Sequence, residues 1–218
     1  MSEGRSTGYY KREFWVEENA KYTRPHHRMR KVARITNGLA GAVPCAVLDV
    51  GCGPATLQGL LAPNVDYYGI DIAVHDPAPN LKESDVVEEP IGFGDRRFDI
   101  VVAQGLFEYL GAAQDRKLAE IAEVLRPRGW LVATYVNFAH RRPNLYWPYS
   151  NIQTPERFRA SLEREFVVER QLVTAHNWNH TEPTRWFMRV ANMHIDTRLP
   201  FVTPRLAVEY AYVCRKRA

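Results

Sequence analysis

A short apolar run that ends in an acid and two glycines constrains this chain more than any other feature. Val47-Leu48-Asp49-Val50 leads directly into Gly51-Cys52-Gly53. Such a run is typical of a buried strand that turns sharply, because glycine tolerates positive φ and lets a ligand approach the backbone. We expect a helix after the turn, since a helix N-terminus offers unpaired N–H groups and a positive dipole end to a bound group.

The residues around the two glycines indicate which ligand the turn would bind. A dinucleotide-binding turn carries a third glycine, but Thr56 stands at that position. Asp49 would also lie unfavourably beside a pyrophosphate. A cofactor with an ammonium, a sulfonium and a ribose suits an acidic turn better. Without any ligand, the same residues could form only a tight strand–helix turn in which Asp49 caps backbone amides.

A second acid lies at the end of the next apolar run, Tyr67-Tyr68-Gly69-Ile70-Asp71. It follows the glycines by roughly 20 residues, where a carboxylate can accept hydrogen bonds from ribose hydroxyls. The two acids at this spacing favour a nucleoside-containing cofactor over a simple turn.

From about Val47 to Val136 the chain resembles class I S-adenosylmethionine-dependent methyltransferases of the small-molecule type. Residues 48–53 resemble the first motif of that family, and Gly69-Ile70-Asp71 resembles its ribose-binding acid. Ser84-Asp85-Val86 resembles the end of the third strand, beside the adenine. Residues 98–109 are similar to the fourth strand with its following helix, and residues 125–132 are similar to the turn into the fifth strand.

The resemblance implies S-adenosylmethionine as the cofactor and a set of residues that bind it. These are Tyr22, Asp49, Gly51, Gly53, Asp71, Ile72, Asp85, Val86 and Gln104. The chain departs from the family pattern in two places. Pro54-Ala55 replaces a frequent Thr-Gly, which should change the stiffness of the turn. Tyr109 stands where many relatives carry His, which should reshape the methionine end of the pocket.

Hydrophobic periodicity predicts an α/β fold with a mostly parallel sheet, and the resemblance implies that it is the doubly wound, seven-stranded sheet of the Rossmann-like methyltransferase fold. Alternating strands and helices imply right-handed crossovers and a ligand at the strand carboxyl ends. The last two strands suit an antiparallel C-terminal edge pair, as the resemblance also implies. The expected strands are 46–50, 66–72, 82–87, 98–103, 130–136, 166–174 and 206–214, and the expected helices are 9–20, 26–41, one around 118–125, 155–165 and 185–195.

Length and composition predict one globular domain with appendages. We expect an N-terminal helical cap over residues 1–42 and a methyltransferase domain over 43–218, with substrate-side insertions near 137–152 and 176–204. The chain has 218 residues, 45% hydrophobic and 25% charged, which is ordinary for a globular protein.

The polar N-terminus and the lack of a long apolar run predict a cytoplasmic enzyme without a membrane partner. Three scattered cysteines predict neither a disulfide framework nor a zinc cluster.

Three segments rich in aromatic residues are candidates for the substrate side. Aromatic rings interleaved with a few polar groups describe a substrate pocket, although the same rings could instead pack a lid onto the domain. The segments are the N-terminal region with Tyr9, Tyr10, Phe14, Trp15 and Tyr22, the loop 137–149 with Trp147, and the stretch 176–180 with Trp178.

A general base helps the methylation of a hydroxyl or a protonated amine, and His suits that role near neutral pH. We expect His140 first, because it follows the fifth strand, and then His176 and His180. The last two could bind zinc if they lay on a helix, but the sequence there does not favour a helix, and we expect no metal. Arg141 and Arg142 could hold a carboxylate or a phosphate.

The predicted function is methyl transfer to an O or N atom of a small metabolite, an anionic one if Arg141 and Arg142 bind it. One alternative is an RNA or protein methyltransferase that uses the basic termini, since the net charge is +4 and the chain ends near Arg215-Lys216-Arg217. Against it, Ala103-Gln104-Gly105-Leu106 lacks the Asn-Pro-Pro-Tyr type motif of amino-methylating relatives, and we expect no nucleic-acid partner. A second alternative is a cofactor-binding partner subunit without chemistry of its own. The oligomeric state and the acceptor stay open.

Overall fold

The computed structural model describes residues 12–19, 22–138, 152–176 and 207–217. Seven strands form one sheet in the order β3-β2-β1-β4-β5-β7-β6. The first five are parallel, and β7 runs antiparallel between β5 and β6. The predicted fold class, including its antiparallel edge pair, is confirmed.

The strands are β1 Cys45–Val50, β2 Val65–Asp71, β3 Leu81–Glu83, β4 Phe98–Ala103, β5 Leu125–Val136, β6 Phe166–His176 and β7 Ala207–Lys216. The α-helices are α1 Arg12–Asn19, α2 His27–Ala40, α3 Gln114–Val124 and α4 Pro155–Glu165. Three short 3₁₀ turns are η3 Gln58–Leu60, η4 Phe107–Tyr109 and η5 Gly111–Ala113.

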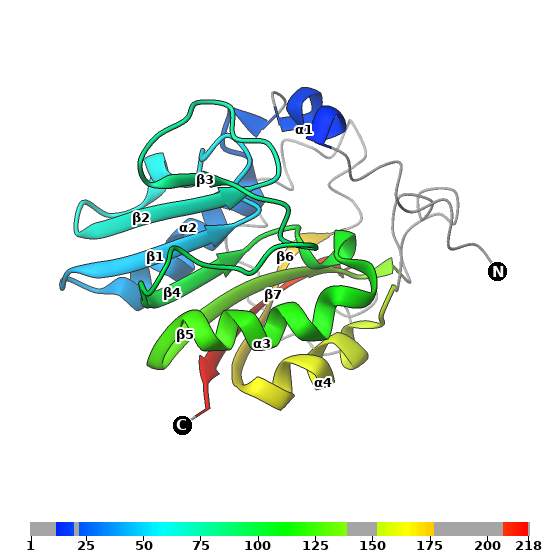
Figure 1. Ribbon diagram of the computed structural model, residues 1–218. Helices are drawn as coiled ribbons and strands as arrows, with labels where there is room; N and C mark the ends of the chain where they lie inside the picture. The colour runs from blue at the N-terminus through cyan, green and yellow to red at the C-terminus, as the bar shows by residue number, and fades with distance from the viewer. Residues whose placement is uncertain (1–11, 20–21, 139–151, 177–206, 218) are drawn as a thin grey trace, which may run out of the picture.

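The helices cover the sheet from both sides. Helices α3 and α4 lie on one face, and α2 lies behind the sheet on the other (Figure 1). Side chains alternate along each strand, so β1 contributes Leu48 to the core beneath α3 and α4, and Val47 to the core beneath α2. Residues Val32 and Ala33 of α2 are buried in that second core. The strand carboxyl ends are thereby held at a common edge of the sheet.

The prediction of a helix after the two glycines is wrong. Residues 51–64, all of them described, contain turns and the single 3₁₀ turn η3 instead of an α-helix. Gly59 and Pro63 fall within this 14-residue connection, and both residue types are poor helix formers. Leu57 nevertheless fills the second core, with 2% of its surface exposed. The connection therefore supplies core contacts without supplying a helix dipole.

Other boundaries differ less from the prediction. Strand β3 is only three residues long, so Asp85 and Val86 follow it in a loop. Strand β5 begins already at Leu125, because the segment before Trp130 pairs with Phe98 across an irregular register. Strand β7 extends to Lys216, so Arg215 and Lys216 belong to the sheet. The helix expected over 185–195 lies outside the described residues.

An aromatic cluster fixes α4 to the antiparallel edge of the sheet. Phe158 of α4 is fully buried and stacks on Tyr135 with 4.2 Å between ring centroids. Phe107 and Tyr212 lie 5.1 and 5.4 Å from it. Because β5, β7 and η4 meet at this ring, it secures the segment that carries residues 104–109.

We expect Phe158→Ala to lower the free energy of unfolding by about 3–5 kcal/mol, because it opens a cavity among the three rings that pack on Phe158. Phe158→Leu keeps most of the volume and should lower it by under about 2 kcal/mol. Urea denaturation followed by circular dichroism measures both values. Equal stability of the wild type and Phe158→Ala would contradict this account of the core.

Candidate active site

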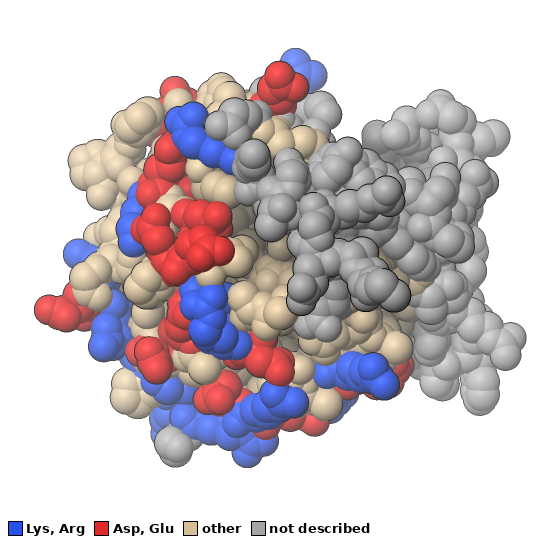
Figure 2. Space-filling model, turned by 45° about the vertical axis from the view of Figure 1, so that its right-hand side comes forward, with Lys and Arg blue, Asp and Glu red and all other residues tan. Residues whose placement is uncertain are grey.

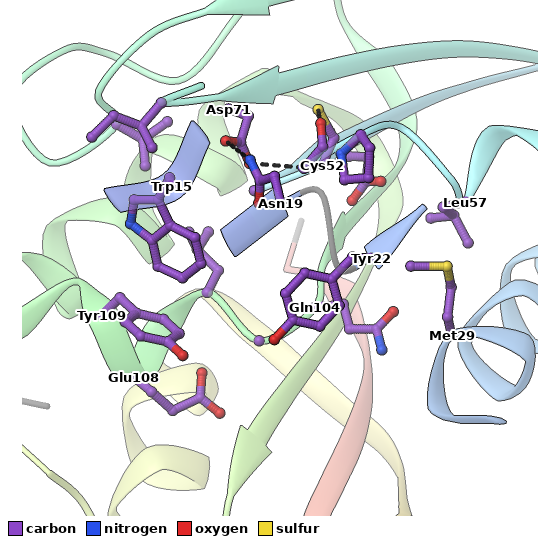
Figure 3. A pocket seen from close by; sticks show the side chains of 18 of the residues that line it. Trp15, Asn19, Tyr22, Met29, Cys52, Leu57, Asp71, Gln104, Glu108 and Tyr109 are labelled. Carbon is purple, nitrogen blue, oxygen red and sulfur yellow. Dashed lines mark hydrogen bonds between the residues drawn. The ribbon is translucent and has the colours of Figure 1, made fainter. Parts of the chain in front are cut away.

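A cavity of about 320 Å³ lies at the carboxyl ends of the parallel strands, beneath α1 (Figure 3). All nine residues expected to bind the cofactor line it: Tyr22, Asp49, Gly51, Gly53, Asp71, Ile72, Asp85, Val86 and Gln104. They come from five separate stretches of the chain, and the parallel sheet brings them together at one edge.

The glycine turn is bonded to the end of the neighbouring strand. Gly51 and Gly53 have φ of 78° and 54°, a conformation that side chains with a Cβ rarely adopt. The amides of Gly51 and Cys52 donate to the Ile70 carbonyl at 2.8 and 3.1 Å, and the Gly53 amide donates to Asp71 Oδ2 at 2.7 Å. These three amides are therefore engaged within the protein.

Asp71 ends β2 and is held by three donors. Besides the Gly53 amide, the Ala73 amide donates to Oδ1 at 3.0 Å and Asn19 Nδ2 donates to Oδ1 at 3.1 Å (Figure 3). Burial raises the pKa of Asp71, and these hydrogen bonds act in the opposite direction. Asn19 comes from α1 and also donates to the Ala73 carbonyl at 3.1 Å. It was missed from the sequence, because no motif precedes it.

Asp49 is a buried acid at the end of β1. Its pKa is raised to about 7, mainly by burial, while the hydrogen bond from Tyr67 lowers it and the charge of Asp71 raises it. The Tyr67 hydroxyl donates to Asp49 Oδ2 at 2.9 Å. Asp49 consequently changes its charge near neutral pH, and a nearby cation would favour its ionised form.

At the opposite end of the cavity, the sequence prediction included Tyr109 but not Glu108, Arg28 or Glu209. Glu108, Tyr109, Arg28 and Glu209 line it, and Figure 3 shows Glu108 and Tyr109 on the side away from Asp71. Arg28 pairs with Glu209 Oε2, and the Thr174 hydroxyl donates to Glu209 Oε1 at 2.6 Å. The α2 start and the β7 start are thus joined by one ion pair at the cavity wall.

Glu108 is buried, with 2% of its surface exposed. The Val136 amide donates to its Oε1 at 2.8 Å. Its Oε2 is buried and has no hydrogen-bond partner among the described residues. Burial raises the pKa of Glu108 to about 7, with Glu209 raising it and Arg28 lowering it.

His26 lines the same cavity at the N-cap of α2. Its Nδ1 accepts a hydrogen bond from the Met29 amide at 3.2 Å. Burial and the charge of Arg28 lower its pKa to about 4. His26 is therefore neutral at pH 7, and its remaining nitrogen carries the hydrogen and can only donate.

The three histidines proposed as bases are not assembled by the described residues. His176 is the last residue of β6, which runs parallel to β5 through β7, so its backbone lies at the cavity edge of the sheet. His140 and His180 lie outside the described residues, as do Arg141, Arg142, Trp147 and Trp178. Their catalytic and binding roles stay predictions.

Part of the aromatic N-terminal set does reach the cavity. Trp15 and Tyr22 line it, and Trp15 packs edge-on against Tyr109 with 5.1 Å between centroids. Phe14 packs on Trp15 at 5.2 Å and is 39% exposed. Tyr109, which stands where relatives carry His, thus supports α1 above the cavity.

The described part of the chain contains no cluster of three or more His, Cys, Asp or Glu side chains arranged to hold a metal. Its helices are too short or too polar to cross a membrane.

Solved structures with the same architecture include methyltransferases from several organisms. The 1,6-didemethyltoxoflavin-N1-methyltransferase of Burkholderia thailandensis, with S-adenosylhomocysteine bound, has a TM-score of 0.64 and 17% identity over 94% of this chain and 85% of that one. The N-methyltransferase NodS of Bradyrhizobium japonicum, also with S-adenosylhomocysteine, has a TM-score of 0.60 and 13% identity over 94% and 99%. A Haloferax volcanii complex of the methyltransferase activator Trm112 with a methyltransferase has a TM-score of 0.64 and 16% identity over 99% and 98%. At these identities the likeness concerns the fold.

Comparison with curated protein sequences gives no match. The family model of a methyltransferase domain, in contrast, matches residues 24–173, which is more than half of the chain. This range includes β1 to β5, and with them the glycine turn and both acids of the cavity. The chain therefore belongs to the methyltransferase-domain family, and its resemblance to S-adenosylmethionine-dependent methyltransferases is confirmed.

Proposed function

We propose that this enzyme transfers a methyl group from S-adenosylmethionine to an O or N atom of a small molecule. The observation that carries the proposal is the Asp71 carboxylate, fixed at the end of β2 by the Gly53 amide and facing the same cavity as Glu108. One end of the cavity suits a ribose, and the other end offers polar groups to an acceptor.

The residues present fit a positively charged cofactor. The described residues that line the cavity carry five carboxyl groups, those of Asp49, Asp71, Asp85, Glu108 and Glu209, and one guanidinium, that of Arg28, which is paired with Glu209. Asp71 would accept the ribose hydroxyls, Asp49 would favour the ammonium, and Asp85 with Val86 would flank the adenine. The cofactor supplies a methyl group on a sulfonium that is already a good leaving group. The protein has to align the acceptor with it and exclude water.

The basic C-terminus gives little support to a nucleic-acid substrate. Because β7 is antiparallel to β5, Arg215 and Lys216 lie at the edge of the sheet opposite the cavity. Arg215 lies over the Trp130 ring at 4.2 Å, and Lys216 Nζ donates to the Leu125 carbonyl at 3.0 Å. On the described part of the face in Figure 2, acidic side chains lie among the basic ones. These features support a small acceptor over an RNA.

His140, His176 and His180 are candidates for removing a proton from the acceptor, and Arg141 and Arg142 are candidates for holding an acceptor that is anionic. Once an acceptor is known, substitution of each histidine and each arginine tests its role.

The proposed cofactor is tested by isothermal titration calorimetry with the full chain. We expect S-adenosylmethionine and S-adenosylhomocysteine to bind and to raise the melting temperature, because ligands that bind only the native state stabilise it. NAD should not bind, since Thr56 replaces the third glycine of a dinucleotide turn. Binding of NAD without binding of S-adenosylhomocysteine would refute the proposal.

We expect Asp71→Ala to weaken S-adenosylhomocysteine binding at least about tenfold. The variant loses hydrogen bonds to a carboxylate, each of which contributes about 1.5–3 kcal/mol. Glu83→Gln is the matched control, because Glu83 is an exposed acid on the neighbouring strand β3 that pairs with Arg12. Calorimetry should show near-normal affinity for the control, and an unchanged affinity of Asp71→Ala would exclude the ribose role.

The affinity for S-adenosylmethionine should rise with pH between 6 and 7.5. Burial raises the pKa of Asp49 to about 7, so its ionised fraction increases from about one-tenth to about three-quarters over this range. A cationic ligand prefers the ionised form, which gives an increase of up to about eightfold. Asp49→Asn should show a flatter profile in the same titrations. Equal pH profiles for both proteins would mean that Asp49 does not sense the bound charge.

A further inference from the structure

We propose that Glu108 receives the methyl acceptor, which is an amine or a hydroxyl compound whose N–H or O–H donates to the free carboxylate oxygen. This inference rests on the proposed function, and it specifies the acceptor as a hydrogen-bond donor. It differs from the expectation of an acid held by arginines.

The position of Glu108 is fixed on the side that faces away from the acceptor. Glu108 lies on η4, directly after β4, and its Oε1 is bound by the Val136 amide at the end of β5. The turn before it is anchored at Gly105, whose amide donates to Thr134 Oγ1 at 2.9 Å. The carboxylate is consequently held between two central strands, and it lines the cavity with Oε2 unused.

A buried polar atom without a hydrogen-bond partner costs free energy, unless a ligand or a water molecule supplies the hydrogen bond. Oε2 of Glu108 is such an atom, in a side chain that is 2% exposed. A carboxylate oxygen accepts hydrogen bonds. The missing partner is therefore a donor.

The neighbouring polar groups already have partners. Glu209 uses Oε2 for Arg28 and Oε1 for the Thr174 hydroxyl. His26 accepts from the Met29 amide and cannot act as a base through that nitrogen. In contrast to Glu209 and to Nδ1 of His26, Glu108 keeps one oxygen, Oε2, that can accept a hydrogen bond.

The charges around Glu108 also favour a donor. Arg28 from α2, Glu209 from β7 and Tyr135 from β5 interact electrostatically with it, and Tyr109 adjoins it on η4. Because Arg28 and Glu209 compensate each other, ionised Glu108 leaves a net negative charge at this end. An anionic acceptor would be repelled there, whereas an amine or a hydroxyl would be attracted.

The same arrangement can remove the acceptor's proton. The acceptor's lone pair forms the new bond to the methyl carbon, and the electron pair of the broken carbon–sulfur bond remains on sulfur. The proton of the acceptor passes to Glu108 Oε2 and then to solvent. Burial raises the pKa of Glu108 to about 7, which suits a base that works at neutral pH.

Glu108→Gln tests the proposal because it should reverse the hydrogen-bonding character of the site. The amide oxygen would keep the bond from the Val136 amide, so the NH₂ group would face the cavity in place of Oε2. The probes are benzylamine, phenol and benzoate, which share one ring and differ in the polar group. Their binding to the protein saturated with S-adenosylhomocysteine is measured by ligand-observed NMR titration.

We expect wild-type protein to bind benzylamine and phenol at least about tenfold more tightly than benzoate. Glu108→Gln should lose this preference and gain affinity for benzoate. Glu120→Gln is the matched control: Glu120 is a partly buried carboxylate that pairs with Lys117 outside the cavity, and the variant should keep the wild-type preference. A wild type that does not prefer the two donors, or a preference unchanged in Glu108→Gln, would overturn the proposal.

If Glu108→Gln fails to fold, the pH dependence of benzylamine binding to the wild type tests the proposal. Benzylamine binding should weaken by about tenfold between pH 8 and pH 6, because protonation occupies the free oxygen, and a pH-independent affinity would overturn the role of Glu108. Absence of S-adenosylhomocysteine binding would instead refute the proposed function. Normal cofactor binding without donor preference would refute only this inference.

Discussion

The cavity depends on a set of backbone hydrogen bonds that join the glycine turn after β1 to the end of β2. The amides of Gly51 and Cys52 bind the Ile70 carbonyl, and the Gly53 amide binds the Asp71 carboxylate. The positive φ of Gly51 and Gly53 lets the turn direct these amides to the neighbouring strand. The conformation that makes glycine necessary therefore also determines where the acid points.

Sequence patterns predicted the central part of this molecule because its constraints are local. A buried strand followed by Asp49, Gly51 and Gly53 has few alternative conformations, and parallel strands bring their carboxyl ends together whatever the loops do. The prediction of a helix after the turn was wrong, because Gly59 and Pro63 disfavour helical backbone in this connection. Leu57 still satisfies the core from a 3₁₀ connection, so tertiary packing does not require a helix there.

The acceptor end of the cavity could not be read from the sequence for a different reason. Arg28 and Glu209 are 181 positions apart, and their pairing exists only once β7 is inserted beside β5. Glu108 looked like an ordinary residue of a short helical turn, since nothing in its neighbours reveals that one oxygen lacks a partner. Asn19 is similar, because its contact with Asp71 requires α1 to lie over the cavity.

The missing helix between β1 and β2 has a consequence for how the protein can be divided. Residues before β1 take over the covering of that face, where Val32, Ala33 and Ala40 of α2 pack with Val47, Ile100 and Val132 of the sheet. The same N-terminal stretch provides Asn19 and Trp15 above the cavity. A fragment that begins at β1 would keep every recognisable motif, yet it would expose one side of its hydrophobic interior to water. The smallest autonomous folding unit is thus larger than the motif-bearing region.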